Sequence, residues 1–145
     1  MMGFNFSDKV SGDWEAGLNK VALLLKSDVA RAGAQAMAQV VYDAAKENAP
    51  VADKPHKLKG GHRYSVPGTL KASIYQVYSK RKSVRSRIEY HVSWNRNKAP
   101  HGHLVEFGTS SAPAHPFLYP AYQHNKARLA AIANAAMAEK VAELK

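Results

Sequence analysis

The sequence contains no cysteine and no long hydrophobic run. Without cysteine, the chain has no disulfide framework, no thiolate metal centre and no cysteine nucleophile. The apolar run near the N-terminus, VALLL at residues 21–25, is far too short for a signal peptide or a membrane span, and acidic residues precede it. We therefore expect a soluble chain that is neither secreted nor bound to a membrane.

Motifs for phosphate binding and acyl transfer are also missing. LKGGHR at residues 58–63 fits neither glycine-rich phosphate motif, and the GTSSA segment is not a Gly-x-Ser-x-Gly elbow. The residue types of a catalytic triad do occur, namely Ser110 as nucleophile, His103 or His115 as base and Glu106 as orienting acid. Residue types alone are weak evidence, so we interpret them as polar turn residues and expect no enzyme activity and no small-molecule substrate.

Metal ligation has similarly weak support. His101 and His103 form a short pair that Glu106 or His115 would complete to a tetrahedral set. Short histidine pairs arise by chance in a chain with seven histidines, and the more specific helical His-Glu-x-x-His pattern does not occur. We expect structural or exposed histidines, and no metal or other cofactor.

What the sequence does contain is an unevenly distributed positive charge. Its 145 residues include 21 Lys or Arg and 11 Asp or Glu, for a net charge of +10. Residues 53–98 hold twelve of the basic residues and only two acids, so the excess belongs to this segment. We expect any anionic partner, protein or DNA, to meet it. The candidate contact residues are Lys54, Lys57, Lys59, Arg63, Lys80, Arg81, Lys82 and Arg85.

Nucleic-acid binding is the alternative function that this charge supports. Lysine and arginine would contact phosphates, and the candidates for stacking on bases are Tyr64, Tyr75, Tyr78 and Trp94. Strict alternation places Trp94 on an apolar strand face, which favours the core over a stacking platform. No recognised RNA-binding or helix-turn-helix signature accompanies the charge.

Hydrophobic patterning predicts a single α+β domain over residues 1–145. Apolar residues at helical spacing predict a long helix over residues 11–48, which Pro50 ends; its stripe includes Trp14, Leu18, Val21 and Leu25. Residues 52–67 are expected to form a basic loop insertion without regular structure. A second, Ala-rich helix is expected to begin near Pro120 and to run to the C-terminus.

Between these helices, residues 69–78 and 87–94 predict a β-hairpin with a basic tip. The second strand alternates strictly, so that one face, consisting of Ile88, Tyr90, Val92 and Trp94, is expected to meet a core. The predicted fold is therefore a long N-terminal helix and a C-terminal helix packed on a small, mainly antiparallel sheet with a projecting basic hairpin.

The stretch HLVEFGTSSAPAHPFLYPAY, residues 103–122, joins the hairpin to the last helix. A positive φ at Gly108 would reverse the chain, and prolines would stiffen the entry to the helix. Glu106, an acid in a basic chain, is expected at an interface, paired with Lys or Arg of the same or a neighbouring subunit. The expected structural anchors are Val105, Phe107, Gly108, Pro116, Phe117 and Pro120.

Four blocks occur in order: AAKENAPV at residues 44–51, GTLKASI at 68–74, the stretch at 103–122, and the Ala-rich terminal helix. In this order they resemble the neck or tail-completion proteins of tailed bacteriophages, the family that includes the minor tail protein Z of phage lambda. The most specific elements are Gly-x-Leu-Lys-x-Ser-Ile and the Val-Glu-Phe-Gly-Thr block followed by Ala-x-Pro-Phe-Leu-x-Pro-Ala. The family usually passes from Ala-Pro-Val to the Gly-x-Leu block in a few residues, whereas here residues 52–67 intervene.

The resemblance implies a non-enzymatic virion protein at the head-to-tail junction. It implies assembly in the host cytoplasm into a homo-oligomeric ring around the DNA channel, with six subunits favoured and twelve as the alternative. The implied partners are other phage neck, connector and tail proteins, with the packaged DNA as a further candidate.

Overall fold

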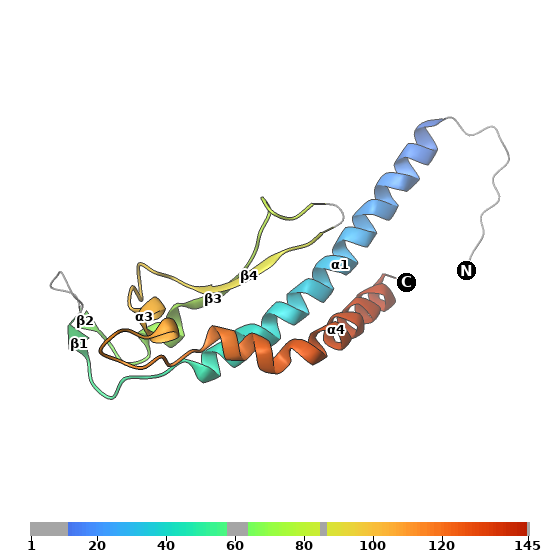
Figure 1. Cartoon of the computed structure of the whole chain (residues 1–145). Coiled ribbons are helices and arrows are strands. Elements are labelled where there is room, and N and C mark those ends of the chain that lie inside the picture. Colours follow the sequence, from blue (N-terminus) through green and yellow to red (C-terminus); the bar gives the residue numbers. More distant parts are fainter. Residues whose placement is uncertain (1–11, 58–63, 85–86, 145) are drawn as a thin grey trace.

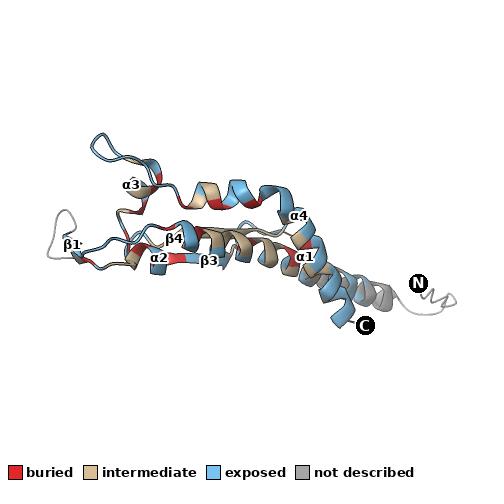
Figure 2. Cartoon of the chain, turned by 90° about the horizontal axis from the view of Figure 1, so that it is seen from below, coloured by how far each residue is buried: buried red, intermediate tan, exposed pale blue. Residues whose placement is uncertain are grey.

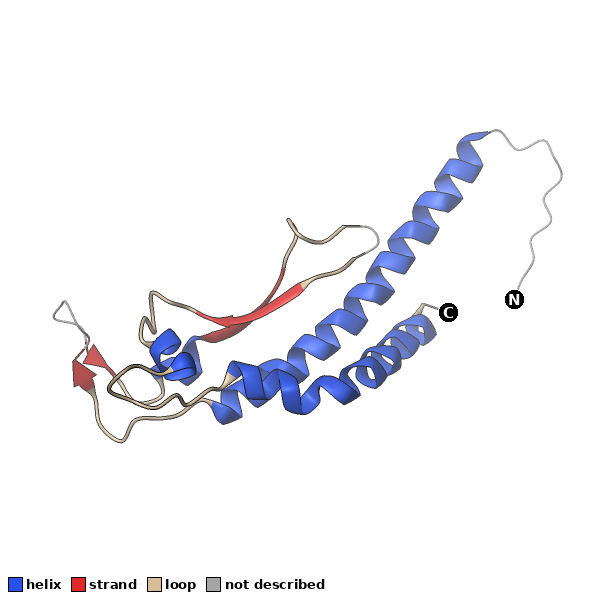
Figure 3. Cartoon of the chain, in the orientation of Figure 1, coloured by secondary structure: helices blue, strands red, loops and turns tan. Residues whose placement is uncertain are grey.

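The computed structural model describes residues 12–57, 64–84 and 87–144. Figures 1 and 3 show two long helices with a β-hairpin beside them. The fold is α+β, as the sequence predicts. The elements in chain order are α1 (Gly12–Asn48), β1 (His56–Lys57), β2 (Tyr64–Ser65), α2 (Thr69–Ser73), β3 (Ile74–Tyr78), β4 (Tyr90–Trp94), α3 (Gly102–Phe107) and α4 (Leu118–Glu143).

Helix α1 is the central element of the fold. The antiparallel strands β3 and β4 pack along α1, and so does α4. The hairpin and α4 thus lie on different sides of the same helix (Figure 2). The hairpin register runs from Ile74 opposite Trp94 to Tyr78 opposite Tyr90. The N-terminal turns of α1 extend beyond both the hairpin and α4 (Figure 1).

The two long helices confirm the patterning of the sequence. Helix α1 is continuous from Gly12 to Asn48, within one residue of its predicted start. Its last turn closes with a hydrogen bond from the Ala49 N–H to the Ala45 carbonyl (3.0 Å). The helix stops there because Pro50 has no N–H and disfavours helical backbone in the residue before it.

Three short segments differ from the prediction. Residues 69–73 form the single helical turn α2 instead of the start of a strand; Gly68, at φ 82°, precedes it, and the Ser73 hydroxyl donates to the Leu70 carbonyl (2.7 Å). Helix α3 lies in the segment between the hairpin and the last helix, where the sequence predicts no helix, and residues 52–67 carry the strand pair β1–β2. Each segment is too short to leave a periodic pattern in the sequence.

The core lies at one end of the molecule, where α1 ends and α2, α3 and the start of α4 meet the hairpin. Phe117 is fully buried, and its ring meets Trp94 edge-on with centroids 5.6 Å apart. Alanine makes up half of the buried cluster, which permits close approach of the elements and keeps the core small. Its members are Ala45, Ala49, Leu70, Ile74, Trp94, Ala99, Phe117 and Ala121.

Gly33 lies where α1 and α4 pack closely together. A Cβ atom on Gly33 would be 2.8 Å from Cγ of Met137 and 3.3 Å from the carbonyl oxygen of Ala133. Both atoms belong to α4, so a side chain at position 33 requires Met137 or the helix to move.

We therefore expect Gly33→Ala to lower the free energy of unfolding by about 1–2 kcal/mol, although alanine has the better helix propensity. Met137→Ala removes the facing side-chain atoms, so the double variant should lose less than the sum of the two single losses. Urea unfolding of all four chains measures this coupling. Strictly additive losses would show that the two residues do not press on each other.

Candidate functional site

An open apolar trough runs between the hairpin and α4. It has a volume of about 770 Å³, and α1 lies at its base because both flanking elements pack on that helix. Helix α3 contributes two further residues to its lining. The lining consists of Ala34, Met37, Ala38 and Val41 of α1; Ile88, Glu89, Tyr90, Val92 and Trp94 in and next to β4; Glu106 and Phe107 of α3; and Leu118, Tyr119, Tyr122 and Leu129 of α4.

The trough explains why the predicted core face of the second strand is only half-buried. Alternation correctly selects Ile88, Tyr90, Val92 and Trp94 as one face, and all four line the trough. Trp94 alone is buried, because it lies at the end of the strand against Phe117, whereas the other three are intermediate. The apolar face of β4 therefore has only part of an opposing layer within this chain.

Exposed aromatic side chains line the trough on the α3 and α4 side. Phe107 is 78% exposed, Tyr119 65% and Tyr122 43%. The prediction that Phe107 anchors in the core is therefore wrong. Successive helical residues point in different directions, and in α3 the buried direction at this turn belongs to Glu106.

Glu106 is buried, at 7% exposure, and it caps α4 from another helix. Its Oε2 accepts hydrogen bonds from the N–H groups of Phe117 (2.7 Å) and Leu118 (3.1 Å), and its Oε1 accepts one from Tyr119 (3.0 Å). The next residue, Pro120, has no N–H, so all the unpaired donors of the first helical turn are accounted for. A carboxylate is the favoured group here because the helix N-terminus carries partial positive charge.

This geometry corrects the prediction that Glu106 lies at an interface and pairs there with Lys or Arg. Glu106 is not an exposed acid awaiting a lysine or arginine; its oxygens bind backbone within the same chain. One sequence signal could have revealed this role. The predicted helix begins at Phe-Leu-Tyr-Pro without a Ser, Thr, Asp or Asn at its start, so its donors need a partner from elsewhere.

The other expected anchors lie as follows. Phe117 is fully buried, and Val105 is half-buried against the core. Gly108 has the positive φ (76°) that the sequence predicts, and a Cβ there would be 2.8 Å from the nitrogen of Ala114. Pro116 is exposed and precedes Phe117, while Pro120 lies in the first turn of α4.

The basic residues fall into two separate groups. Lys54, just before β1, and Lys57, in β1, are exposed, whereas Lys80, Arg81 and Lys82 are exposed at the hairpin tip. Figure 1 places β1 near one end of the molecule and the hairpin tip along α1, so the fold does not gather them on one surface. The remaining candidates, Lys59, Arg63 and Arg85, lie outside the described residues.

The hairpin tip also contains a counter-charge. Glu89 lies 3.7 Å from Lys82, 3.9 Å from Arg87 and 3.0 Å from His91. The Glu89 side chain is 31% exposed, and its pairs with Lys82 and Arg87 contribute about 0–1 kcal/mol each; the contact with His91 is an ion pair only when the imidazole is protonated. They organise the tip rather than stabilise the fold.

The described residues do not bring the candidate catalytic or metal-binding side chains together. Glu106 binds backbone N–H groups, and Ser110 is exposed in a turn where Thr109 Oγ1 accepts bonds from the N–H groups of Ser111 and Ala112. No hydrogen bond found among the described residues joins Ser110 to Glu106 or to a histidine ring. Within those same residues, no three His, Asp or Glu side chains cluster as metal ligands.

His101 contacts His56 rather than His103. The two rings meet edge-on with centroids 5.4 Å apart, and Nδ1 of His103 lies 2.8 Å from the Pro100 carbonyl oxygen instead. Burial, and secondarily the neighbouring His56, lower the pKa of His101 from its ordinary value. The His101 ring therefore favours the neutral form, and its contact with His56 packs the start of α3 against β1.

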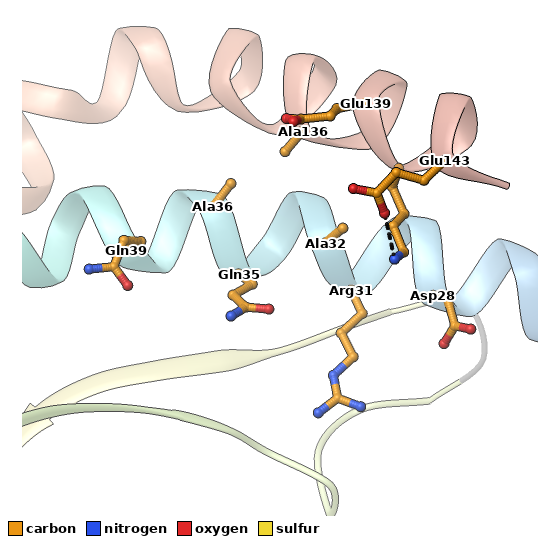
Figure 4. A pocket seen from close by; sticks show the side chains of 10 residues that line it. Asp28, Arg31, Ala32, Gln35, Ala36, Gln39, Ala136, Glu139 and Glu143 are labelled. Atoms are coloured by element: carbon orange, nitrogen blue, oxygen red, sulfur yellow. Dashed lines mark hydrogen bonds and ion pairs between the residues drawn. The ribbon is translucent and has the colours of Figure 1, made fainter.

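A second hollow, of about 610 Å³, lies between α1 and the C-terminal half of α4 (Figure 4). Its polar lining includes the pair Lys140–Glu143, whose charged atoms are 2.9 Å apart. Figure 4 shows Arg31 pointing away from α4 toward the hairpin. There its guanidinium lies 4.3 Å from the centre of the Tyr78 ring and donates to the Tyr90 hydroxyl (3.4 Å). The hollow is thus a cleft between two charged helix faces, and Arg31 fixes the hairpin.

Because Phe107 is largely exposed, we expect Phe107→Ala to change the free energy of unfolding of the monomer by no more than about 0.5 kcal/mol. The matched control is Phe117→Ala, at a fully buried phenylalanine ten residues away, which should cost about 3–5 kcal/mol. Thermal unfolding at low protein concentration compares the two. Equal losses would contradict the exposed position of Phe107.

Comparison with known proteins supplies a family match. Residues 14–108 match the family model described as "Bacteriophage HK97-gp10, putative tail-component". The match covers more than half of the chain, from the first turn of α1 to the end of α3, and α4 follows it. No curated protein and no solved structure matches the chain.

None of the described helices is both long enough and apolar enough to cross a bilayer.

Proposed function

This chain belongs to the HK97-gp10-like family of bacteriophage tail components, and from this membership we propose that it is a structural virion protein at the head-to-tail junction. In this role it completes the neck or the tail. It acts by binding other proteins and carries out no reaction. It assembles in the host cytoplasm and remains in the virion.

The observation that carries the proposal is the open apolar trough. Monomeric proteins rarely expose large contiguous apolar surfaces, and those that do generally use them to bind partners. Here apolar side chains of β4 and α4 face a hollow of about 770 Å³, with Phe107, Tyr119 and Tyr122 exposed beside it. Aromatic residues in such positions are typical of protein interfaces.

The subunits form a ring in this proposal, with six copies favoured and twelve as the alternative. Tailed-phage junctions join tubes of rotational symmetry, so a cyclic ring presents the same surface to every neighbouring subunit. The neighbours are other neck, connector and tail proteins, and DNA passes through the channel.

Deleting the gene from a phage that carries it tests the proposal. Electron micrographs of the lysate should show heads and tails that are not joined, and a plasmid copy of the gene should restore complete particles. Normal virions from the deleted phage would overturn the proposed function.

The basic hairpin tip has a proposed role of its own, in contact with an acidic neighbour or with channel DNA. We expect the triple variant Lys80→Glu, Arg81→Glu, Lys82→Glu to reduce complete particles at least tenfold, because reversed charges repel the same partner. Lys126→Glu, an exposed change on α4, is the control for added negative charge. Undiminished assembly and DNA delivery by the triple variant would remove this role.

The same triple variant also distinguishes the proposed function from the alternative, nucleic-acid binding, which the net charge of +10 favours. A dedicated DNA-binding protein holds free duplex DNA tightly, and its affinity falls steeply with salt. A junction protein is expected to bind free duplex only weakly. Tight, salt-dependent binding that the triple variant abolishes, together with normal virions from the deleted phage, would favour the alternative.

A further inference from the structure

The chain exposes more surface than a compact monomer of its size. Its accessible surface is 11046 Å², whereas a compact monomer of 145 residues exposes about 7,400 Å². The twenty residues outside the described ranges account for at most about 3,200 Å² of this, even if fully extended. At least about 7,800 Å² therefore belongs to the 125 described residues, whereas a compact monomer of that length exposes about 6,600 Å². The difference, about 1,200 Å², is larger than the roughly 800 Å² that a standard interface takes from each partner.

Two apolar surfaces that no other described residues cover account for part of that excess, and they lie at different places on α1. One is the trough, over the C-terminal half of α1. The other is the N-terminal part of α1, whose first turns extend beyond α4 (Figure 1). In this part of the helix Val21 is 52% exposed and Leu25 is 42% exposed. Val21 and Leu25 are four residues apart, so they lie on one helix face, and the sequence continues the same spacing at Leu18 and Trp14.

The two surfaces are of the kinds that bind each other, an apolar helix face and an apolar trough. An apolar helix face with anchors at three- and four-residue spacing is the form that enters a hydrophobic groove. The trough offers apolar walls on β4 and α4, over small residues such as Ala34 and Ala38 of α1. Within one chain the two surfaces cannot meet, because the helix face and the base of the trough are successive parts of the same continuous helix.

We infer that the N-terminal part of α1 of one subunit lies in the trough of the next copy of this chain. The contact is head-to-tail, since it joins two different surfaces, and head-to-tail contacts close into rings when the rotation permits. This inference rests on the proposed function and names its interface. Two such contacts per subunit would cover both exposed apolar surfaces.

Complementation between two variants tests the inference. Tyr122→Glu places a charge in the trough, and Leu25→Glu places one on the helix face; each variant alone should associate at least tenfold more weakly than the wild-type chain. An equimolar mixture should form a one-to-one pair that grows no further, because each variant retains the surface that the other has lost. Native mass spectrometry measures the species.

A surface variant outside both contact surfaces is the control for this experiment. Tyr75→Glu changes a tyrosine of similar exposure (42%) on β3 and should assemble as the wild type does. If Tyr122→Glu fails to fold, Phe107→Glu, at a more exposed residue of the same trough, replaces it. Circular dichroism confirms folding of each variant.

Three outcomes would overturn the inference: a wild-type chain that remains monomeric, single variants that assemble normally, or a mixture that stays monomeric. None of these outcomes decides the proposed function. That function fails only if phage without the gene still makes joined particles.

Discussion

Replacing Gly102 with alanine is expected to lower the free energy of unfolding by about 3–4 kcal/mol. A Cβ atom at this position would lie 2.2 Å from Nε1 and 2.6 Å from Cδ1 of Trp94, well inside contact distance. The ring of Trp94 also packs edge-on against Phe117 in the buried cluster, so moving it disturbs that contact as well. The substitution therefore has to displace the indole or α3 itself.

Urea unfolding of Gly102→Ala measures the loss, and Gly17→Ala is the matched control. Gly17 also lies in a helix, but a Cβ there meets nothing within 4 Å, so alanine should stabilise the chain by up to about 1 kcal/mol. The same substitution is thus expected to have opposite signs at the two glycines. A Gly102→Ala chain as stable as the wild type would show that Trp94 does not pack on Gly102.

The second large effect concerns Glu106. Glu106→Ala is expected to cost about 3–5 kcal/mol, because three backbone N–H groups at the start of α4 lose a charged acceptor and one of them, that of Phe117, is buried. Glu106→Gln keeps the shape and one acceptor oxygen, so about 1–2 kcal/mol is expected. Glu139→Ala, at an exposed acid of α4, should change stability by less than about 0.5 kcal/mol.

Hydrogen exchange locates this effect. In Glu106→Ala, the amides of Phe117, Leu118 and Tyr119 should exchange faster, whereas those in the middle of α1 should lose protection only through the global loss of stability. Unchanged stability of Glu106→Ala, or unchanged exchange at these three amides, would contradict the capping role.

The long elements of this fold are predictable from the sequence for a physical reason. Helix α1 and strand β4 each repeat an apolar pattern over enough residues to reveal its period. Helices α2 and α3 span one turn or slightly more, and tertiary contacts decide them: Gly102 is helical where its backbone meets Trp94. Local pattern carries no information about such a contact.

The exchange of roles between Glu106 and Phe107 has the same origin. Hydrophobicity alone places the phenylalanine inside and the carboxylate outside. The structure has the reverse, because the partly buried start of α4 supplies three N–H donors that an apolar side chain cannot satisfy. Asn125, buried in α4 and bonded to the Ala121 carbonyl (2.7 Å), is another polar residue that the apolar pattern misses.

The trough could be predicted only in part. Alternation identifies which side chains of β4 share a face, but it does not tell whether the opposing layer comes from the same chain. In this protein the face is half-covered, and the remaining surface is available to a neighbour. A sequence pattern for a core and one for an interface are identical when the interface is as apolar as a core.

The most direct test of the head-to-tail assembly uses the absence of cysteine from the chain. Leu25→Cys and Tyr122→Cys variants would be mixed and treated with a short bifunctional maleimide, with Tyr75→Cys as the control partner. The account predicts a covalent dimer of Leu25→Cys with Tyr122→Cys, a ladder of larger species from the double variant, and little product with the control. Efficient cross-linking of either single variant to itself, or none between the two, would contradict it.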